Sequence, residues 1–142
     1  RVSIYTAAVD IIRHYWVTGI GVGAFPQIYP LFSFEAANAY HAHNLFLQEF
    51  IELGIIGFLV MGLLFLCFFQ RVYSAMHTAP KRFRFLLGAV CGGFAGLLLQ
   101  GLTDHLWFVY RVVLFFWCFL GIGMATVRVA ERKAERETEE GE

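Results

Sequence analysis

Three long runs of residues with almost no charge most constrain what this chain can fold into. Residues 53–69 and 85–102 contain no charged side chain, and residues 106–127 contain one, Arg111. A helix needs about 17–25 predominantly apolar residues to cross a bilayer. A chain of 142 residues is too short to bury three such helices on all sides, which disfavours the alternative of a soluble core. The sequence therefore predicts an all-α membrane protein with three transmembrane helices.

The distribution of basic residues predicts the orientation of these helices. Residues 70–84 carry four basic side chains and no acid, and residues 128–142 add four more among six glutamates. The connection between the second and third runs has no Lys or Arg. Because cytoplasmic loops are enriched in Lys and Arg, we expect the first loop and the charged tail, residues 128–142, to be cytoplasmic. Residues 1–52 then form an extracytoplasmic segment, and residues 53–127 form the three spans.

The extracytoplasmic segment has its own pattern. Apolar residues at helical spacing over residues 2–16 predict an amphipathic helix at the outer surface. The following stretch, GIGVGAFPQIYP, predicts an irregular connection. Its G-x-G-x-G spacing and the proline at position 26 argue against a dinucleotide-binding loop. The chain starts with Arg1 in place of Met, so we expect the carboxy-terminal part of a longer membrane protein, and we expect this part alone to be inactive.

Polar side chains gather just before the first apolar run. His41, His43 and Asn44 precede it directly, and Glu49 and Glu52 lie on its first turns. An asparagine at a helix start can cap free backbone N–H groups. A neutral imidazole beside it can accept a proton from a hydroxyl as a general base. Glu52 lies near the expected membrane boundary, where it could contact a cation of a partner. The alternative for the histidines is interfacial polar residues without a chemical role, and the favoured alternative for the two glutamates is solvated or interfacial acids.

Two charged residues near the third apolar run are further candidates for a functional site. Arg111 follows Asp104 by seven residues, which is close to two helical turns and would place both on one helix face. A charge within a span is costly unless it is paired or faces a polar cavity. We therefore expect either a structural Asp104–Arg111 pair or a functional site. Arg1 and Arg13 add guanidinium groups, whose planar fork suits phosphate.

The three cysteines, Cys67, Cys91 and Cys118, lie within the apolar runs and far apart in sequence. They show no metal or redox spacing and predict no disulfide framework. We expect small packing residues and no metal site.

One motif resembles that of a known family. His43-Asn44, nine further residues (LFLQEFIEL) and Gly54-Ile55-Ile56-Gly57 are similar to a signature of the O-antigen ligase and polymerase family. In that signature, a histidine and a small polar residue precede nine residues and G-x-x-G. Residues 1–30 resemble the start of the family's outer loop, with its leading arginine and G-x-G-x-x-x-F turn. Residues 101–117, GLTDHLWFVYRVVLFFW, resemble a late span of many members from Gram-positive bacteria.

The resemblance implies a multi-pass glycosyltransferase of the bacterial cytoplasmic (inner) membrane, with a helical bundle of the GT-C type. Such enzymes move a glycan from an undecaprenyl diphosphate carrier to a glycan, lipid or protein acceptor, without metal, nucleotide sugar or other cofactor. By position, His43 matches the family's essential histidine, the proposed general base, and Arg1 matches a loop arginine proposed to bind the diphosphate. Glu52, Asp104 and Arg111 belong to recurring family patterns.

From this resemblance we expect particular binding partners and site residues, and two other functions remain as alternatives. We expect contacts with the lipid bilayer, the glycan donor and the acceptor, and none with nucleic acid. His41, Asp104, Arg1 and Arg111 are the predicted substrate-binding residues. Asn44, Gly54 and Gly57 are the predicted structural positions. A peptidoglycan-type glycosyltransferase is disfavoured by the His-Asn motif. A non-catalytic transporter or flippase subunit would place ionisable residues deep in several spans, whereas only Arg111 lies within one here.

Overall fold

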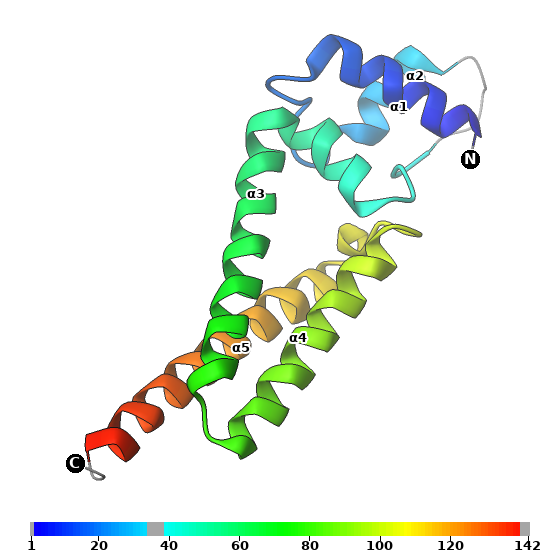
Figure 1. Ribbon diagram of the computed structural model, residues 1–142. Coiled ribbons are helices and arrows are strands. Elements are labelled where there is room, and N and C mark those ends of the chain that lie inside the picture. The colour runs from blue at the N-terminus through cyan, green and yellow to red at the C-terminus, as the bar shows by residue number, and fades with distance from the viewer. Residues whose placement is uncertain (1, 34–38, 140–142) are drawn as a thin grey trace. The chain divides into compact units, whose positions relative to one another are not determined.

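The computed structural model describes residues 2–33 and 39–139. The helices of this part are α1 (Val2–Tyr15), α2 (Phe25–Phe32), α3 (Leu45–Thr78), α4 (Lys81–Gly101), the 3₁₀ turn η1 (Leu106–Phe108) and α5 (Tyr110–Glu139) (Figure 1). No described residue forms a β-strand. The chain divides into two compact units. The first unit is the chain up to Leu63 together with Leu99–Tyr110, and the second is Leu64–Leu98 together with the chain from Arg111 onward.

Three of the helices, α3, α4 and α5, are long and apolar enough to cross a membrane. Large apolar side chains such as Leu59 and Leu63 on α3 and Leu114 on α5 are exposed along them. Exposed apolar surface of this extent is stable against lipid or against further helices, but not against water. The prediction of an all-α membrane protein with three candidate spans is therefore confirmed.

The helices extend beyond the apolar runs from which they were predicted. α3 begins eight residues before residue 53, and α5 continues to Glu139 through most of the charged tail. The third helix also begins later than expected, at Tyr110, because His105 and Val109, which flank η1, are extended. Arg111 is thus the second residue of α5 and does not lie deep within it.

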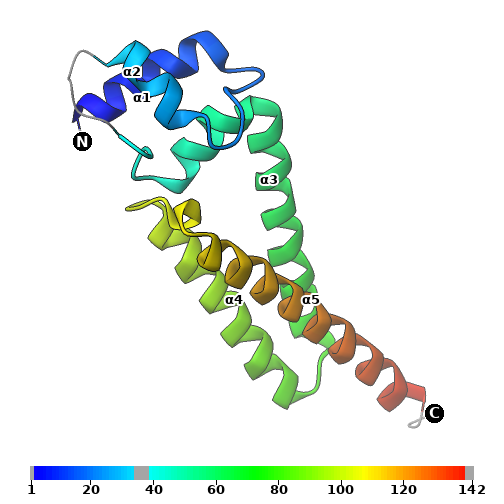
Figure 2. The same cartoon turned by 180° about the vertical axis from the view of Figure 1, so that it is seen from behind.

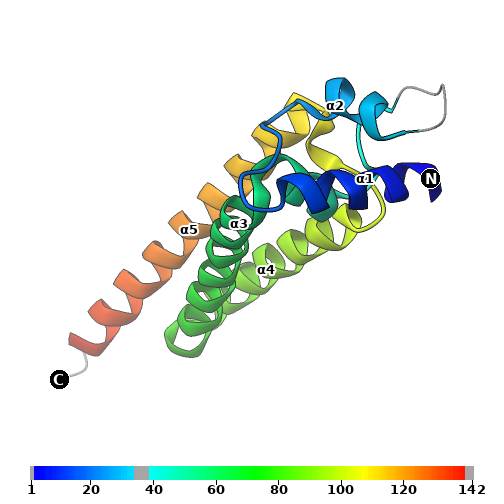
Figure 3. The same ribbon diagram turned by 90° about the horizontal axis from the view of Figure 1, so that it is seen from above.

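The first unit has a small hydrophobic core that α1 and α2 share with the start of α3. Ala7, Ala8 and Ile11 of α1 are fully buried, as are Phe25 and Tyr29 of α2. The two helices lie side by side (Figures 1 and 3). The alanines allow close approach because they have no side chain beyond Cβ. Ala42 and Ile51 complete the same core, which attaches the segment before α3 to α1 and α2.

Helix α2 was not expected from the sequence, because its prolines and the preceding glycines were interpreted as an irregular connection. Pro26 lies in the first turn of α2, where a helix does not need the missing N–H group. Three of the four described glycines with positive φ, Gly19, Gly21 and Gly23, precede the helix. The irregular part is therefore confined to the residues between α1 and α2.

Helix α3 is kinked at Gly54, whose φ of 66° and ψ of −174° are not helical. The kink leaves backbone N–H and C=O groups of α3 without partners in the helix. Residues just after α1 form hydrogen bonds with these groups instead. Ile20 and Gly21 donate their N–H groups to the carbonyls of Ile51 and Glu52, each at 3.0 Å, and Ile55 donates to the carbonyl of Trp16 at 2.7 Å. The first turns of α3 are thereby fixed to the connection between α1 and α2.

The second unit is held together by aromatic side chains. Phe68 of α3 lies 4.5 Å from Phe94 of α4, and Phe116 of α5 lies 5.0 Å from Phe94, measured between ring centroids. These distances are typical of favourable aromatic pairs. Arg71 of α3 and Glu131 of α5 add an ion pair at 3.5 Å. Figure 2 shows α3, α4 and α5, the helices that carry these side chains.

Candidate active site

The polar segment before α3 forms a tight turn whose backbone is held on both sides. Among the described residues, His43 is the one non-glycine residue with positive φ, at 51°, a conformation that is uncommon for a residue with a side chain. Ala42, which is fully buried, donates its N–H group to Oε1 of Gln48 at 2.7 Å. Gln48 in turn donates to Oε1 of Glu52 at 2.6 Å. A buried hydrogen-bond chain therefore fixes the residue between the two histidines.

Asn44 joins this turn to two helices. Its Oδ1 accepts the N–H group of Leu47 at 2.9 Å, the contact of an N-cap residue at the start of α3. Its Nδ2 donates to the carbonyl of Leu102, just after α4, at 2.9 Å. Leu45 packs so closely on Gly101 that a side chain at position 101 would collide with it. The start of α3 and the end of α4 are therefore in direct contact within the first unit.

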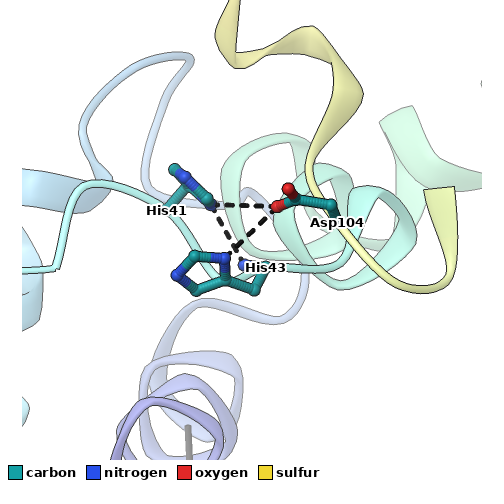
Figure 4. A group of neighbouring side chains, drawn as sticks. All are labelled: His41, His43 and Asp104. Carbon is teal, nitrogen blue, oxygen red and sulfur yellow. Dashed lines mark hydrogen bonds and ion pairs between the residues drawn. The ribbon is translucent and has the colours of Figure 1, made fainter. Parts of the chain in front are cut away.

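This contact brings Asp104 to the two histidines. Oδ1 of Asp104 lies 3.2 Å from Nδ1 of His43 and 3.9 Å from Nδ1 of His41. Figure 4 shows both imidazoles beside the carboxylate. The N–H group of His43 donates to Nδ1 of His41 at 3.2 Å. Phe108 of η1 packs on the ring of His41, with 4.7 Å between ring centroids.

The hydrogen bonds determine the charge of the carboxylate. The N–H group of His105 donates to Oδ1 of Asp104 at 2.8 Å, and this bond is the main reason why the pKa of Asp104 is lowered. Partial desolvation opposes the shift, and the two imidazoles add to it. Asp104 is therefore ionised at neutral pH and accepts hydrogen bonds only.

The same contacts assign the protons of the imidazoles. An ionised Asp104 can bond to Nδ1 of His43 only if that nitrogen carries a proton, which leaves Nε2 of a neutral His43 with a lone pair. Burial, followed by the charge of His43, lowers the pKa of His41 despite the opposing effect of Asp104. His41 is therefore neutral, and its 3.9 Å approach to Asp104 is not an ion pair at neutral pH. Burial also lowers the pKa of His105 to about 4.

The remaining predicted residues lie in different settings. Arg1 is outside the described residues. Asp104 lies in a turn before η1, and the extended backbone around η1 separates it from α5, so the expected two-turn spacing to Arg111 does not place the two residues on one helix face. Arg111 is exposed and belongs to the second unit. Arg13 pairs with Asp10 at 3.2 Å on the exposed side of α1.

Sequence reasoning missed two features of this site. Gln48 was not singled out, although it is the residue that tethers the histidine turn. The contact between His43 and Asp104 was also missed because 61 residues separate them. One signal pointed to it: the HAHN and TDH segments each adjoin an apolar run at the end expected on the same side of the membrane.

Fold and site together define an all-α membrane protein with an imidazole–carboxylate pair at the ends of two apolar helices. Residues 1–62 match the family model described as O-antigen ligase. The match confirms the resemblance to that family and includes His43, Asn44, Gly54 and Gly57, whereas Asp104 lies outside it. No curated protein and no solved structure matched the chain.

Proposed function

We propose that the protein transfers a glycan from an undecaprenyl diphosphate carrier to a hydroxyl group of an acceptor, at the outer face of the bacterial cytoplasmic membrane. The family match over residues 1–62 and three helices able to cross a bilayer support this class of reaction. The observation that carries the proposal is the 3.2 Å contact between Nδ1 of His43 and Asp104. This contact leaves Nε2 of His43 as the nitrogen that can accept a proton.

In the proposed reaction the acceptor hydroxyl oxygen attacks the anomeric carbon of the glycan. A bond forms between these two atoms while the bond from that carbon to the diphosphate oxygen breaks, and the diphosphate leaves with the electron pair. The hydroxyl proton passes to Nε2 of His43, and the ionised Asp104 stabilises the resulting imidazolium. The diphosphate is already a good leaving group, so the reaction needs no metal ion and no nucleotide sugar.

Cationic and donor groups have to bind the diphosphate and orient the glycan. Arg1 and Arg111 are our proposed diphosphate ligands, because a guanidinium matches the geometry of phosphate oxygens. His41 is a proposed glycan or phosphate ligand. Its Nδ1 accepts the N–H group of His43, so a neutral His41 carries its proton on Nε2 and can donate it to an oxygen.

The experiment that tests the reaction uses the full-length protein, purified and placed in lipid. It supplies a labelled undecaprenyl diphosphate-linked glycan and a panel of hydroxyl acceptors. We expect labelled acceptor and free undecaprenyl diphosphate to form in equal amounts, without added nucleotide sugar. Flipping of the labelled donor across the bilayer without transfer would contradict the proposal and support a flippase. No product with any acceptor, from protein that binds the donor, would also contradict it.

A further inference from the structure

Three groups that bind metal ions converge at the active site. Nδ1 of His41, Nδ1 of His43 and one carboxylate oxygen of Asp104 all lie within 4.8 Å of one another (Figure 4). Tetrahedral zinc with bonds of about 2.0–2.1 Å places neighbouring ligand atoms roughly 3.3 Å apart. The 3.2 Å and 3.9 Å separations from Asp104 are already close to that value. Small side-chain rotations would therefore bring all three groups onto one ion, which would replace the N–H group of His43 as the partner of Nδ1 of His41.

We propose that His41, His43 and Asp104 bind a divalent transition-metal ion, with zinc as the best fit, and that the bound ion inhibits glycan transfer. The inhibitory part rests on the proposed function, whereas the binding part does not. Two imidazoles and one carboxylate suit zinc and its first-row neighbours, while Mg²⁺ and Ca²⁺ prefer oxygen ligands alone. Three protein ligands leave one coordination position for water.

The surroundings of the three ligands favour binding. The turn that carries both histidines is already held by the buried Ala42–Gln48 hydrogen bond. Binding of an ion therefore costs little backbone conformational entropy. The side chain of Asp104 is 54% exposed and that of His43 is 35% exposed, which gives an ion access from solvent. Nδ1 of His105 is buried without a hydrogen-bond partner among the described residues, and its ring lies 5.7 Å from that of His41. His105 thus lies beside the cluster but is not one of its three possible ligands.

Binding at Nδ1 explains why the ion would inhibit. In the metal-free site Asp104 bonds to the protonated Nδ1 of His43, and Nε2 carries the lone pair. An ion on Nδ1 moves the proton of the neutral ring to Nε2, so the nitrogen that would accept the acceptor's proton no longer can. The ion also takes up the carboxylate of Asp104, which would otherwise stabilise the imidazolium. Zinc therefore removes both parts of the proposed general base at once.

Cobalt titration tests binding directly. We expect Co²⁺ added to the purified protein to give visible bands of a nitrogen- and oxygen-ligated site, saturating at one ion per chain and displaced by Zn²⁺. His41→Asn should lose these bands, because Asn keeps an acceptor for the N–H group of His43 but is a poor zinc ligand. His77→Ala, in the second unit, should retain them. A thiolate-to-cobalt band, or unchanged binding in His41→Asn, would overturn the assignment.

Transfer measured with zinc or with a chelator tests inhibition separately. We expect Zn²⁺ to lower the transfer rate of the wild-type protein and a chelator to restore it. Zn²⁺ should inhibit His41→Asn much less than wild type, when the rate of each protein is compared with its own metal-free rate. A rate that zinc raises, or that a chelator abolishes, would contradict inhibition. If the wild-type protein shows no transfer under any condition, the proposed function fails, and the cobalt titration still decides the metal site.

Discussion

His43, the proposed general base, combines an unusual backbone conformation with a fixed ring. His43, which has positive φ, lies between Ala42, whose buried N–H group bonds to Gln48, and the helix-capping Asn44. The same backbone directs its N–H group to Nδ1 of His41. Non-glycine residues in this conformation carry a cost and tend to occur at functional sites. The turn therefore sets the direction of the His43 ring, and Asp104 sets its tautomer.

Asp104→Asn tests the role of the carboxylate as a positioning residue. An asparagine can still bond to Nδ1 of His43 but carries no charge to stabilise the imidazolium. We expect kcat to fall by about 10²-fold or more with little change in KM. A purely structural role would instead lower the amount of folded protein and leave the kcat of that protein unchanged. Asp10→Asn, which removes an exposed ion pair on α1, is the matched control and should leave kcat unaltered.

A comparison of two histidine variants tests which imidazole is the base. We expect His41→Ala to lower transfer much less than His43→Ala does, because His41 accepts a hydrogen bond from the backbone of His43 and is not the proposed base. Initial rates at saturating donor and acceptor provide the measurement. An equal loss in both variants would mean that the assignment of a single base to His43 is wrong.

The residues of this site differ in how far the sequence could predict them. His43 and Asn44 could be singled out because a histidine and an asparagine at the start of an apolar run have a local chemical meaning. The approach of Asp104 could not, since it depends on the packing of Leu45 against Gly101 and on the hydrogen bond from Asn44 to Leu102. These contacts join residues far apart in sequence and follow only from the folded first unit.

At the scale of elements, the kink in α3 positions the site. Gly54 has positive φ, and a Cβ there would collide with the backbone of Val17 and Gly19. The carbonyls released by the kink accept hydrogen bonds from Ile20 and Gly21. The segment from Asn44 to the kink, which includes the N-cap residue and Gln48, is thereby attached to the core formed by α1 and α2.

Gly54→Ala should therefore be strongly destabilising. The substitution adds the strain of positive φ, about 1–3 kcal/mol, and a collision with backbone that cannot move aside. Gly21→Ala is the matched control, because Gly21 also has positive φ, at 96°, but has open space around its Cβ position. We expect the thermal midpoint of purified protein in lipid or detergent to fall further for Gly54→Ala. Equal midpoints would show that the close approach to Val17 and Gly19 does not hold the kink.

The elements themselves were predictable to different degrees. The apolar runs predicted α3, α4 and α5 because the length of a run and its lack of charge are enough to identify such helices. Their ends were missed by several residues, since polar helix turns outside an apolar run carry no hydropathy signal. α2 was missed because Pro26 and Pro30 indicate irregular structure in sequence, although a proline in the first turn of a helix is tolerated.

At the scale of the whole molecule, the charge distribution predicts which helix ends face the cytoplasm. We expect a membrane-impermeant thiol reagent to label Thr103→Cys in intact cells, because this exposed position lies in the short connection after α4. Thr78→Cys, exposed at the end of α3, should be labelled only after the membrane is opened. The native Cys67, Cys91 and Cys118 lie in the apolar helices, so the unmodified protein gives the background. The opposite labelling pattern would reverse the topology and contradict an outer active site.

The most direct measurement of the central proposal compares donor binding with transfer in His43→Ala. The variant should insert into membranes and bind the undecaprenyl diphosphate-linked glycan as wild type does, because the base does not contact the carrier's diphosphate in the proposed reaction. The transfer rate at saturating substrate should fall by about 10²–10⁴-fold, the usual contribution of a general base. His77→Ala, expressed at the same level, should transfer at the wild-type rate. Transfer retained by His43→Ala would contradict the proposal that this histidine is the base.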